Sequence, residues 1–133
     1  MTVEEFVAAE AATGTSLQRG DVLFLRTGHS RRRAELGPWD AATLHAGLHL
    51  RVMPLLHERE VAALASDSDG DTQPRNCDGI AWPIHAIGIA SIGLHFVDHL
   101  DLEHLAAAWS NSDGGNSCAS SCRSLSTAPP GRR

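Results

Sequence analysis

The sequence has no apolar run that approaches the roughly 20 residues that a membrane-spanning helix requires. Its first five residues carry two glutamates and no basic residue, whereas a secretory leader begins with positive charge. The sequence therefore predicts a cytoplasmic protein that does not have a membrane as a partner.

The sequence also lacks the positive surplus that binding to nucleic acid requires. Its formal net charge is −5, and its one basic run, Arg31–Arg33, falls in a predicted loop. Arginines in such a loop are most often a solvated surface feature. We therefore expect no nucleic-acid partner, because proteins of that class present a basic face.

Cysteine is scarce, with Cys77, Cys118 and Cys122 as its three occurrences. An odd number in polar surroundings does not resemble the disulfide framework of a small secreted protein. Cys118 and Cys122 also have no second ligand pair nearby, which a structural zinc site would need. The cysteines predict neither disulfides nor zinc.

What the sequence does contain is typical of one globular domain. It has 133 residues, of which 42% are hydrophobic and 20% charged. A first helix is predicted to begin at Thr2, whose spacing to Glu5 fits a capping box, and to end at Gly14.

The next elements alternate between strand and helix. Apolar runs predict strands at 22–25 and 61–65, and Pro54 suits the first turn of a helix between them. Residues 28–46, which contain Gly37 and Pro38, are predicted to form an irregular loop. The strand-helix-strand order predicts the α/β class.

The remaining sequence divides into an apolar part and a polar tail. Residues 84–97 contain two glycines, and we predict a strand, a close backbone approach and a second short strand. Asp101 is then placed to cap a helix. Seven serines lie between Ser110 and Ser126, with little to bury, so we predict a domain at 1–109 and a disordered tail at 110–133.

Aspartates alternate in Asp67–Asp71, which invites a calcium-loop interpretation. The loop has Thr72 where an EF-hand needs glycine at its sixth position, and Asp78 where it needs glutamate at its twelfth. We predict a solvated turn at the end of a strand instead.

His85 and Asp98 are the most informative polar residues, because they bracket the predicted apolar strand. Such groups are costly to bury without a partner, so the pattern suggests a paired site, including a metal site. The alternative is that His85 is a satisfied core histidine and Asp98 a helix cap.

Three blocks, occurring in the same order, resemble the second half of the cyclase family: Gly20–Gly28, Gly47–Asp67 and Pro83–Ala106. This family comprises metal-dependent amide hydrolases, including bacterial kynurenine formamidase and isatin hydrolase. The resemblance covers roughly residues 1–108 and implies part of a swivelling β/β/α-type domain.

The resemblance also implies a chemistry and its residues. His85 and Asp98, the latter where other members have Glu, resemble the family's second-half metal ligands for Zn²⁺ or Mn²⁺. Asp67 matches a strand-end Asp that helps to shape the site. The bound metal would activate water to attack a small-molecule amide substrate.

The family's first-half signature, His-x-Gly-Thr-His-x-Asp, is absent from the sequence. The run from His45 to Arg51 imitates it, but Leu48 replaces the Thr and Arg51 replaces the ligating Asp. A cation cannot coordinate a metal. His45 and His49 remain as a candidate metal pair if this segment is helical, since they are four residues apart.

Three functions therefore compete. The first is a fragment of a cyclase-family amide hydrolase that is inactive alone, and the second is a non-catalytic remnant or interaction module with the same half-fold. Unpaired strand edges in half a sheet would favour a homo-oligomer in either case. The third is a histidine-rich metal-binding domain that uses some of His45, His49, His57, His95, His99 and His104.

Overall fold

The computed structural model describes residues 1–111 and 122–126. Within them, no helix combines the length and apolar character needed to cross a membrane. The helices are α1 (Val3–Thr13), α2 (His29–Leu36), α3 (Met53–Glu58), α4 (Pro83–Ile92) and α5 (Glu103–Asn111), with a 3-10 turn, η1 (Leu50–Val52), and the strands are β1 (Val22–Arg26), β2 (Ala63–Ser66), β3 (His95–Val97) and β4 (Cys122–Ser126).

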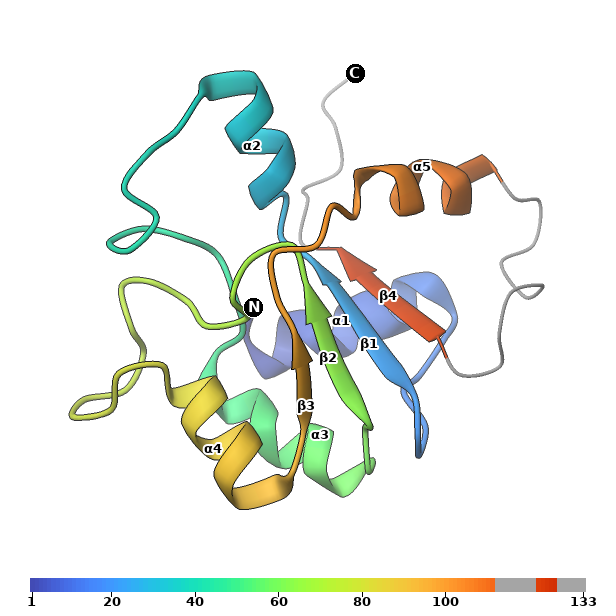
Figure 1. Ribbon diagram of the computed structural model, residues 1–133. Coiled ribbons are helices and arrows are strands. Elements are labelled where there is room, and N and C mark those ends of the chain that lie inside the picture. The colour runs from blue at the N-terminus through green and yellow to red at the C-terminus, as the bar shows by residue number, and fades with distance from the viewer. Residues whose placement is uncertain (112–121, 127–133) are drawn as a thin grey trace.

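The strands form one parallel sheet in the order β3-β2-β1-β4, and their arrowheads all point to the same edge (Figure 1). Ala63 of β2 lies beside Val22 of β1 and beside His95 of β3. The predicted α/β class and the predicted strands at 22–25 and 61–65 are confirmed, although β1 continues one residue further, to Arg26, and β2 begins two residues later and ends one residue later than the apolar run suggested.

Helix α1 has the predicted boundaries. The Thr2 hydroxyl accepts the Glu5 amide at 3.3 Å, and the Glu5 carboxylate accepts the Thr2 amide at 2.7 Å. Gly14 ends the helix at φ +64°, a left-handed conformation that glycine adopts without steric cost. The capping box and its stop are therefore confirmed.

The core lies where α1, α3 and α4 pack against the sheet. Phe6 of α1, Leu23 and Leu25 of β1, Leu56 of α3 and Ile84 of α4 are all buried in one apolar cluster. Leu23 and Leu25 alternate with half-buried neighbours along β1, as expected for a strand with one face against the core.

Helix α2 corrects the prediction of an irregular loop at 28–46. Gly28 precedes the helix at φ +82°, and the Gly28 and His29 amides both donate to the Asp67 carboxylate at 2.9 Å. Asp67 is 39 residues away from Gly28 in sequence. Because the cap comes from so far along the chain, no local signal marked the helix start.

Helix α4 corrects the prediction of a strand at the start of 84–97. Pro83 occupies its first turn, and the Ile84 amide donates to the Asp71 carboxylate at 2.8 Å. The predicted close approach is present, since a Cβ on Gly88 would lie 2.5 Å from Phe96 Cζ. The second predicted strand is β3, and Asp101 accepts the Glu103 amide at 3.0 Å at the start of α5, as predicted.

The predicted tail, 110–133, is only partly covered by the described residues. Helix α5 continues to Asn111, and residues 122–126 form β4, which pairs with β1. Residues 112–121 and 127–133 lie outside the described part, and the boundary at 109 stays a prediction.

Candidate functional site

The carboxyl ends of β1, β2 and β3 bring three polar loops to one edge of the sheet (Figure 1). They are 27–29, 67–71 and 98–99, which directly follow those strands. In open parallel sheets this edge is where ligands bind, because the loops converge there. The candidate site is built on these loops.

His85 and Asp98 are brought together, although not as the ends of one strand. His85 stands in the first turn of α4 and stacks on Phe96 of β3, with ring centroids 4.5 Å apart. Its Nε2 lies 3.0 Å from Asp98 Oδ2. The prediction of a pair is confirmed, but the prediction that one strand links the two residues is wrong.

Asp71 is the partner that the sequence interpretation missed. Its fully buried carboxylate lies 2.7 Å from His85 Nδ1 and accepts the backbone amides of Ile84 and His85 at 2.8 and 3.4 Å. Asp71 thus caps α4 and orients the imidazole. The signal that was available is a run of aspartates at the carboxyl end of a buried strand; the prediction of a solvated turn is wrong for Asp67 and Asp71, which are both buried.

The three side chains form what we call the His85 triad: Asp71, His85 and Asp98. Burial lowers the pKa of His85, but its hydrogen bonds to the two carboxylates and their negative charge outweigh that effect and raise the pKa above its ordinary value. When His85 is protonated, each of its ring nitrogens can donate to one of the two carboxylates. Asp98 Oδ1 is buried and has no hydrogen-bond partner among the described residues.

The triad does not by itself fit a catalytic metal. The described residues contain no group of three or more His, Cys, Asp or Glu side chains that could hold a metal ion. Both nitrogens of His85 already face carboxylates, so a metal ion would have to displace one of these contacts to reach the ring. A catalytic zinc site takes three protein ligands, and the roles of His85 and Asp98 as ligands stay a prediction.

The other candidate pair, His45 and His49, is not on a helix. His45 lies in an isolated bridge with Gln73, and its Nε2 is 2.7 Å from Asp69 Oδ1. His49 precedes η1, where its Nδ1 accepts the Arg51 amide at 3.1 Å. The proposed helical metal pair is therefore wrong, since the two side chains have different partners.

Asp67 holds the loop between β1 and α2. Its buried carboxylate accepts the Thr27 amide at 2.7 Å and the Thr27 hydroxyl at 2.8 Å, in addition to the Gly28 and His29 amides. These four bonds fix the position of His29 at the sheet edge. Its predicted role in shaping the site stays a prediction that this geometry supports.

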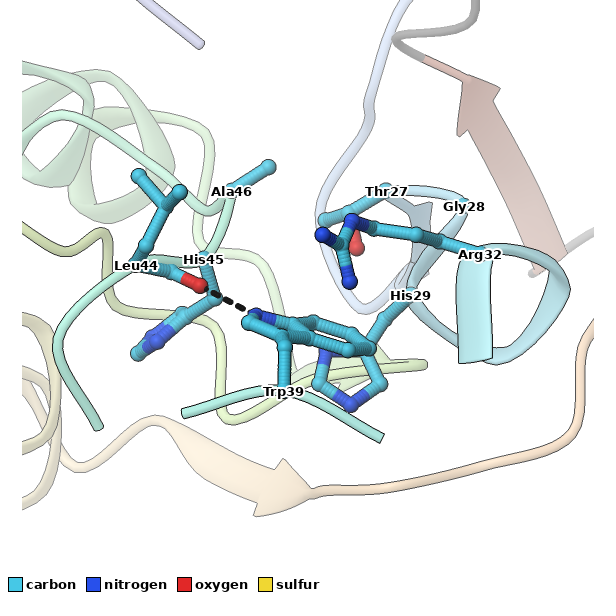
Figure 2. A pocket seen from close by; sticks show the side chains of 8 residues that line it. All are labelled: Thr27, Gly28, His29, Arg32, Trp39, Leu44, His45 and Ala46. Carbon is cyan, nitrogen blue, oxygen red and sulfur yellow. Dashed lines mark hydrogen bonds between the residues drawn. The ribbon is translucent and has the colours of Figure 1, made fainter. Parts of the chain in front are cut away.

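A cavity of about 310 Å³ opens beside this loop (Figure 2). A second cavity of about 200 Å³ shares His29 and His45 with it and continues to Asp69, Trp82 and His99. Burial lowers the pKa of His29 despite the nearby charge of Asp67. The first cavity is lined by Thr27, Gly28, His29, Arg32, Trp39, Leu44, His45 and Ala46.

Comparisons with known proteins point to one family. A family model described as "Putative cyclase" matches residues 1–70. A crystal structure of a novel cyclase matches with a TM-score of 0.67 and 21% identity, over 82% of this chain but 36% of that chain. The chain thus spans about a third of that solved relative, and the likeness at this identity shows the fold. No curated protein matches the sequence.

Proposed function

This chain belongs to the cyclase family, and from that membership we propose that it supplies one part of a metal-dependent amide hydrolase. The proposed substrate is a small-molecule amide and the proposed metal is Zn²⁺ or Mn²⁺. We propose a cytoplasmic location for the hydrolase.

The His85 triad is the observation that carries this proposal. It places an imidazole and two carboxylates at the carboxyl edge of a parallel sheet, where α/β proteins bind their ligands. Asp98 Oδ1 is buried without a partner among the described residues, which is a costly arrangement unless a ligand completes it. Asp71 fixes the orientation of His85 from behind, as carboxylates commonly do for ligating histidines.

The same geometry supports the view that the chain is inactive alone. Two ligands fall short of the three that a catalytic zinc site takes, and the described residues offer no larger cluster. We propose that a segment with the His-x-Gly-Thr-His-x-Asp signature supplies the missing ligands and displaces one carboxylate from His85. The outer strands of the described sheet, β3 and β4, each pair on one side, which favours association with such a segment or with a second copy.

The second candidate is a non-catalytic module with the same half-fold. It is favoured by the fact that both nitrogens of His85 are already satisfied by carboxylates. In this case the triad is an ion-pair network that joins α4 to the loops after β2 and β3, and it binds no metal in any context.

Calorimetric titration with Zn²⁺ and Mn²⁺ distinguishes the two. We expect no tight site and no amide hydrolysis with the chain alone, and a new site when the chain is fused behind a segment with the missing signature. In the fusion, His85→Ala and Asp98→Asn should each weaken metal binding at least roughly tenfold. The matched controls are His95→Ala and Asp101→Asn, since both residues are exposed and lie outside the triad.

If the fusion gains no site, or if the four variants bind equally, the module explanation replaces the hydrolase. Turnover by the chain alone that is abolished by a chelator would instead contradict the proposal that it is inactive by itself.

A further inference from the structure

The cavity beside α2 has a preorganised aromatic wall. The Trp39 indole donates from Nε1 to the Leu44 carbonyl at 2.6 Å, and the Arg32 guanidinium carbon lies 3.9 Å from the Trp39 ring centroid. The His29 ring is 4.6 Å from the same ring, and Figure 2 shows these side chains gathered at the opening between α2 and the 44–46 segment. A ligand would therefore meet side chains whose positions are already fixed.

The charges around this cavity leave one cation without a compensating carboxylate. Both oxygens of Asp67 already accept hydrogen bonds, from four donors in all. Asp69 Oδ1 lies 2.7 Å from His45 Nε2. His29 favours its neutral form, because burial lowers its pKa. In the part of the chain that the structure describes, Arg32 forms no ion pair and its guanidinium lies over the Trp39 ring, so it is available to an anion.

We propose that the cavity binds a small organic carboxylate, with Arg32 as the anchor of the carboxylate group. The planar guanidinium presents paired N–H donors that match a carboxylate, and a volume of about 310 Å³ is at the small end of the range for ligand sites. Trp39, Leu44 and Ala46 offer apolar surface to the rest of the ligand.

The position of the cavity links this ligand to the His85 triad. The adjoining cavity of about 200 Å³ reaches Trp82 and His99. Trp82 lies three residues before His85 along the chain, and His99 directly follows Asp98. A ligand anchored at Arg32 can therefore extend along the carboxyl edge toward the triad. That this ligand is the amide substrate rests on the proposed function, whereas its binding at Arg32 does not.

The test is an NMR titration of the chain as it is, without metal, that follows the indole N–H signals of its three tryptophans. The probes are benzoate, benzamide as a neutral molecule of the same shape, and inorganic phosphate as an anion without an apolar body. We expect benzoate to shift the Trp39 signal in a saturable manner and to leave the signal of Trp109, which does not line the cavity, unchanged.

Variants of α2 assign the binding to one side chain. Arg32→Gln should weaken benzoate binding roughly tenfold or more, because a charge-assisted hydrogen bond is lost. Arg33→Gln is the matched control, since Arg33 is an exposed arginine of the same helix that does not line the cavity. Arg32→Lys keeps the charge without the planar fork and should bind with intermediate affinity, so the test does not depend on the Gln variant folding.

Four outcomes would overturn the inference: no saturable shift with benzoate, equal binding of benzoate and benzamide, equal binding of phosphate and benzoate, or equal losses in Arg32→Gln and Arg33→Gln. None of these bears on metal binding by the fusion described above, so the two proposals fail separately.

Discussion

Two histidine-aspartate contacts lie at the same sheet edge and differ in their exposure and in the number of carboxylates that face the histidine. His45 is 3% exposed, with one nitrogen on the Ala41 carbonyl and the other facing Asp69. His85 is 23% exposed and faces a carboxylate from each nitrogen. The first contact closes a loop and is shielded from solvent, whereas the second joins a helix to two loops and stays partly open to solvent.

Replacing the two aspartates should give the largest difference between the contacts. Asp71→Ala removes both the cap of α4 and a partner of His85, and we expect it to lower the free energy of unfolding by about 3 kcal/mol. Asp69→Ala should cost about 1 kcal/mol, because the loop of His45 keeps its backbone hydrogen bonds to Gln73. Urea denaturation of both variants measures the contrast, and equal losses would show that Asp71 is no more than another loop carboxylate.

A double-mutant cycle on His45 and Asp69 tests whether their contact is a structural tie. We expect a coupling free energy of about 1 kcal/mol between His45→Ala and Asp69→Ala, since the pair is close but Asp69 is partly exposed. The single variants should leave the fusion's metal affinity unchanged. A loss of metal binding in either would place this contact in the functional site and remove the contrast with the His85 triad.

The pH dependence of stability should separate His85 from His29. The pKa of His85 is raised in the folded protein, so its contribution is fully present below the unfolded value near ~6.5 and is lost as the pH rises through the folded pKa. The pKa of His29 is lowered, so its protonation favours unfolding as the pH falls. As the pH rises, the free energy of unfolding of the unaltered protein should fall relative to that of His85→Gln. It should rise relative to that of His29→Gln.

Urea denaturation of the three proteins between pH 5 and 8 provides the measurement. If the free energy of unfolding changes with pH in the same way in all three proteins, both assignments are wrong. If the two differences between the unaltered protein and a variant change with pH in the same direction, one assignment is wrong.

The smallest expected effect concerns the ion pair between Arg26 and Glu103. Arg26 Nε and one terminal nitrogen lie 2.9 and 2.7 Å from the two Glu103 oxygens, which joins β1 to α5. Glu103 is partly exposed, so Glu103→Gln should cost only about 0.5–1 kcal/mol. The loss should shrink as salt is added, and a loss that is independent of salt would indicate packing rather than charge.

The sequence predicted those parts of the fold that depend on neighbours along the chain. The capping box of α1, the apolar runs of β1 and β2 and the Asp101 cap of α5 are local signals, and all three are present. The pairing of His85 with Asp98 was also predictable, because both are polar residues beside an apolar run. Their placement on a helix and after a strand was not.

The missed elements depend on contacts between distant residues. Helices α2 and α4 have no capping side chain at their own first residues, and Asp67 and Asp71 supply those bonds from 39 and 13 residues away. Strand β4 is ordered by pairing with β1, which lies far back in the chain. Local sequence patterns cannot reveal either kind of contact. For the same reason they predicted a solvated turn at Asp71, whose partners are distant along the chain.

The loop after β2 holds the first turns of two helices, since Asp67 binds the Gly28 amide and Asp71 binds the Ile84 amide. The short segment 67–71 therefore connects the cavity beside α2 to the His85 triad. If this segment unfolds locally, both helix ends lose their caps together, so the Gly28 and Ile84 amides should exchange with deuterium at similar opening free energies. A ligand bound in the cavity beside α2 would then also slow exchange of the Ile84 amide.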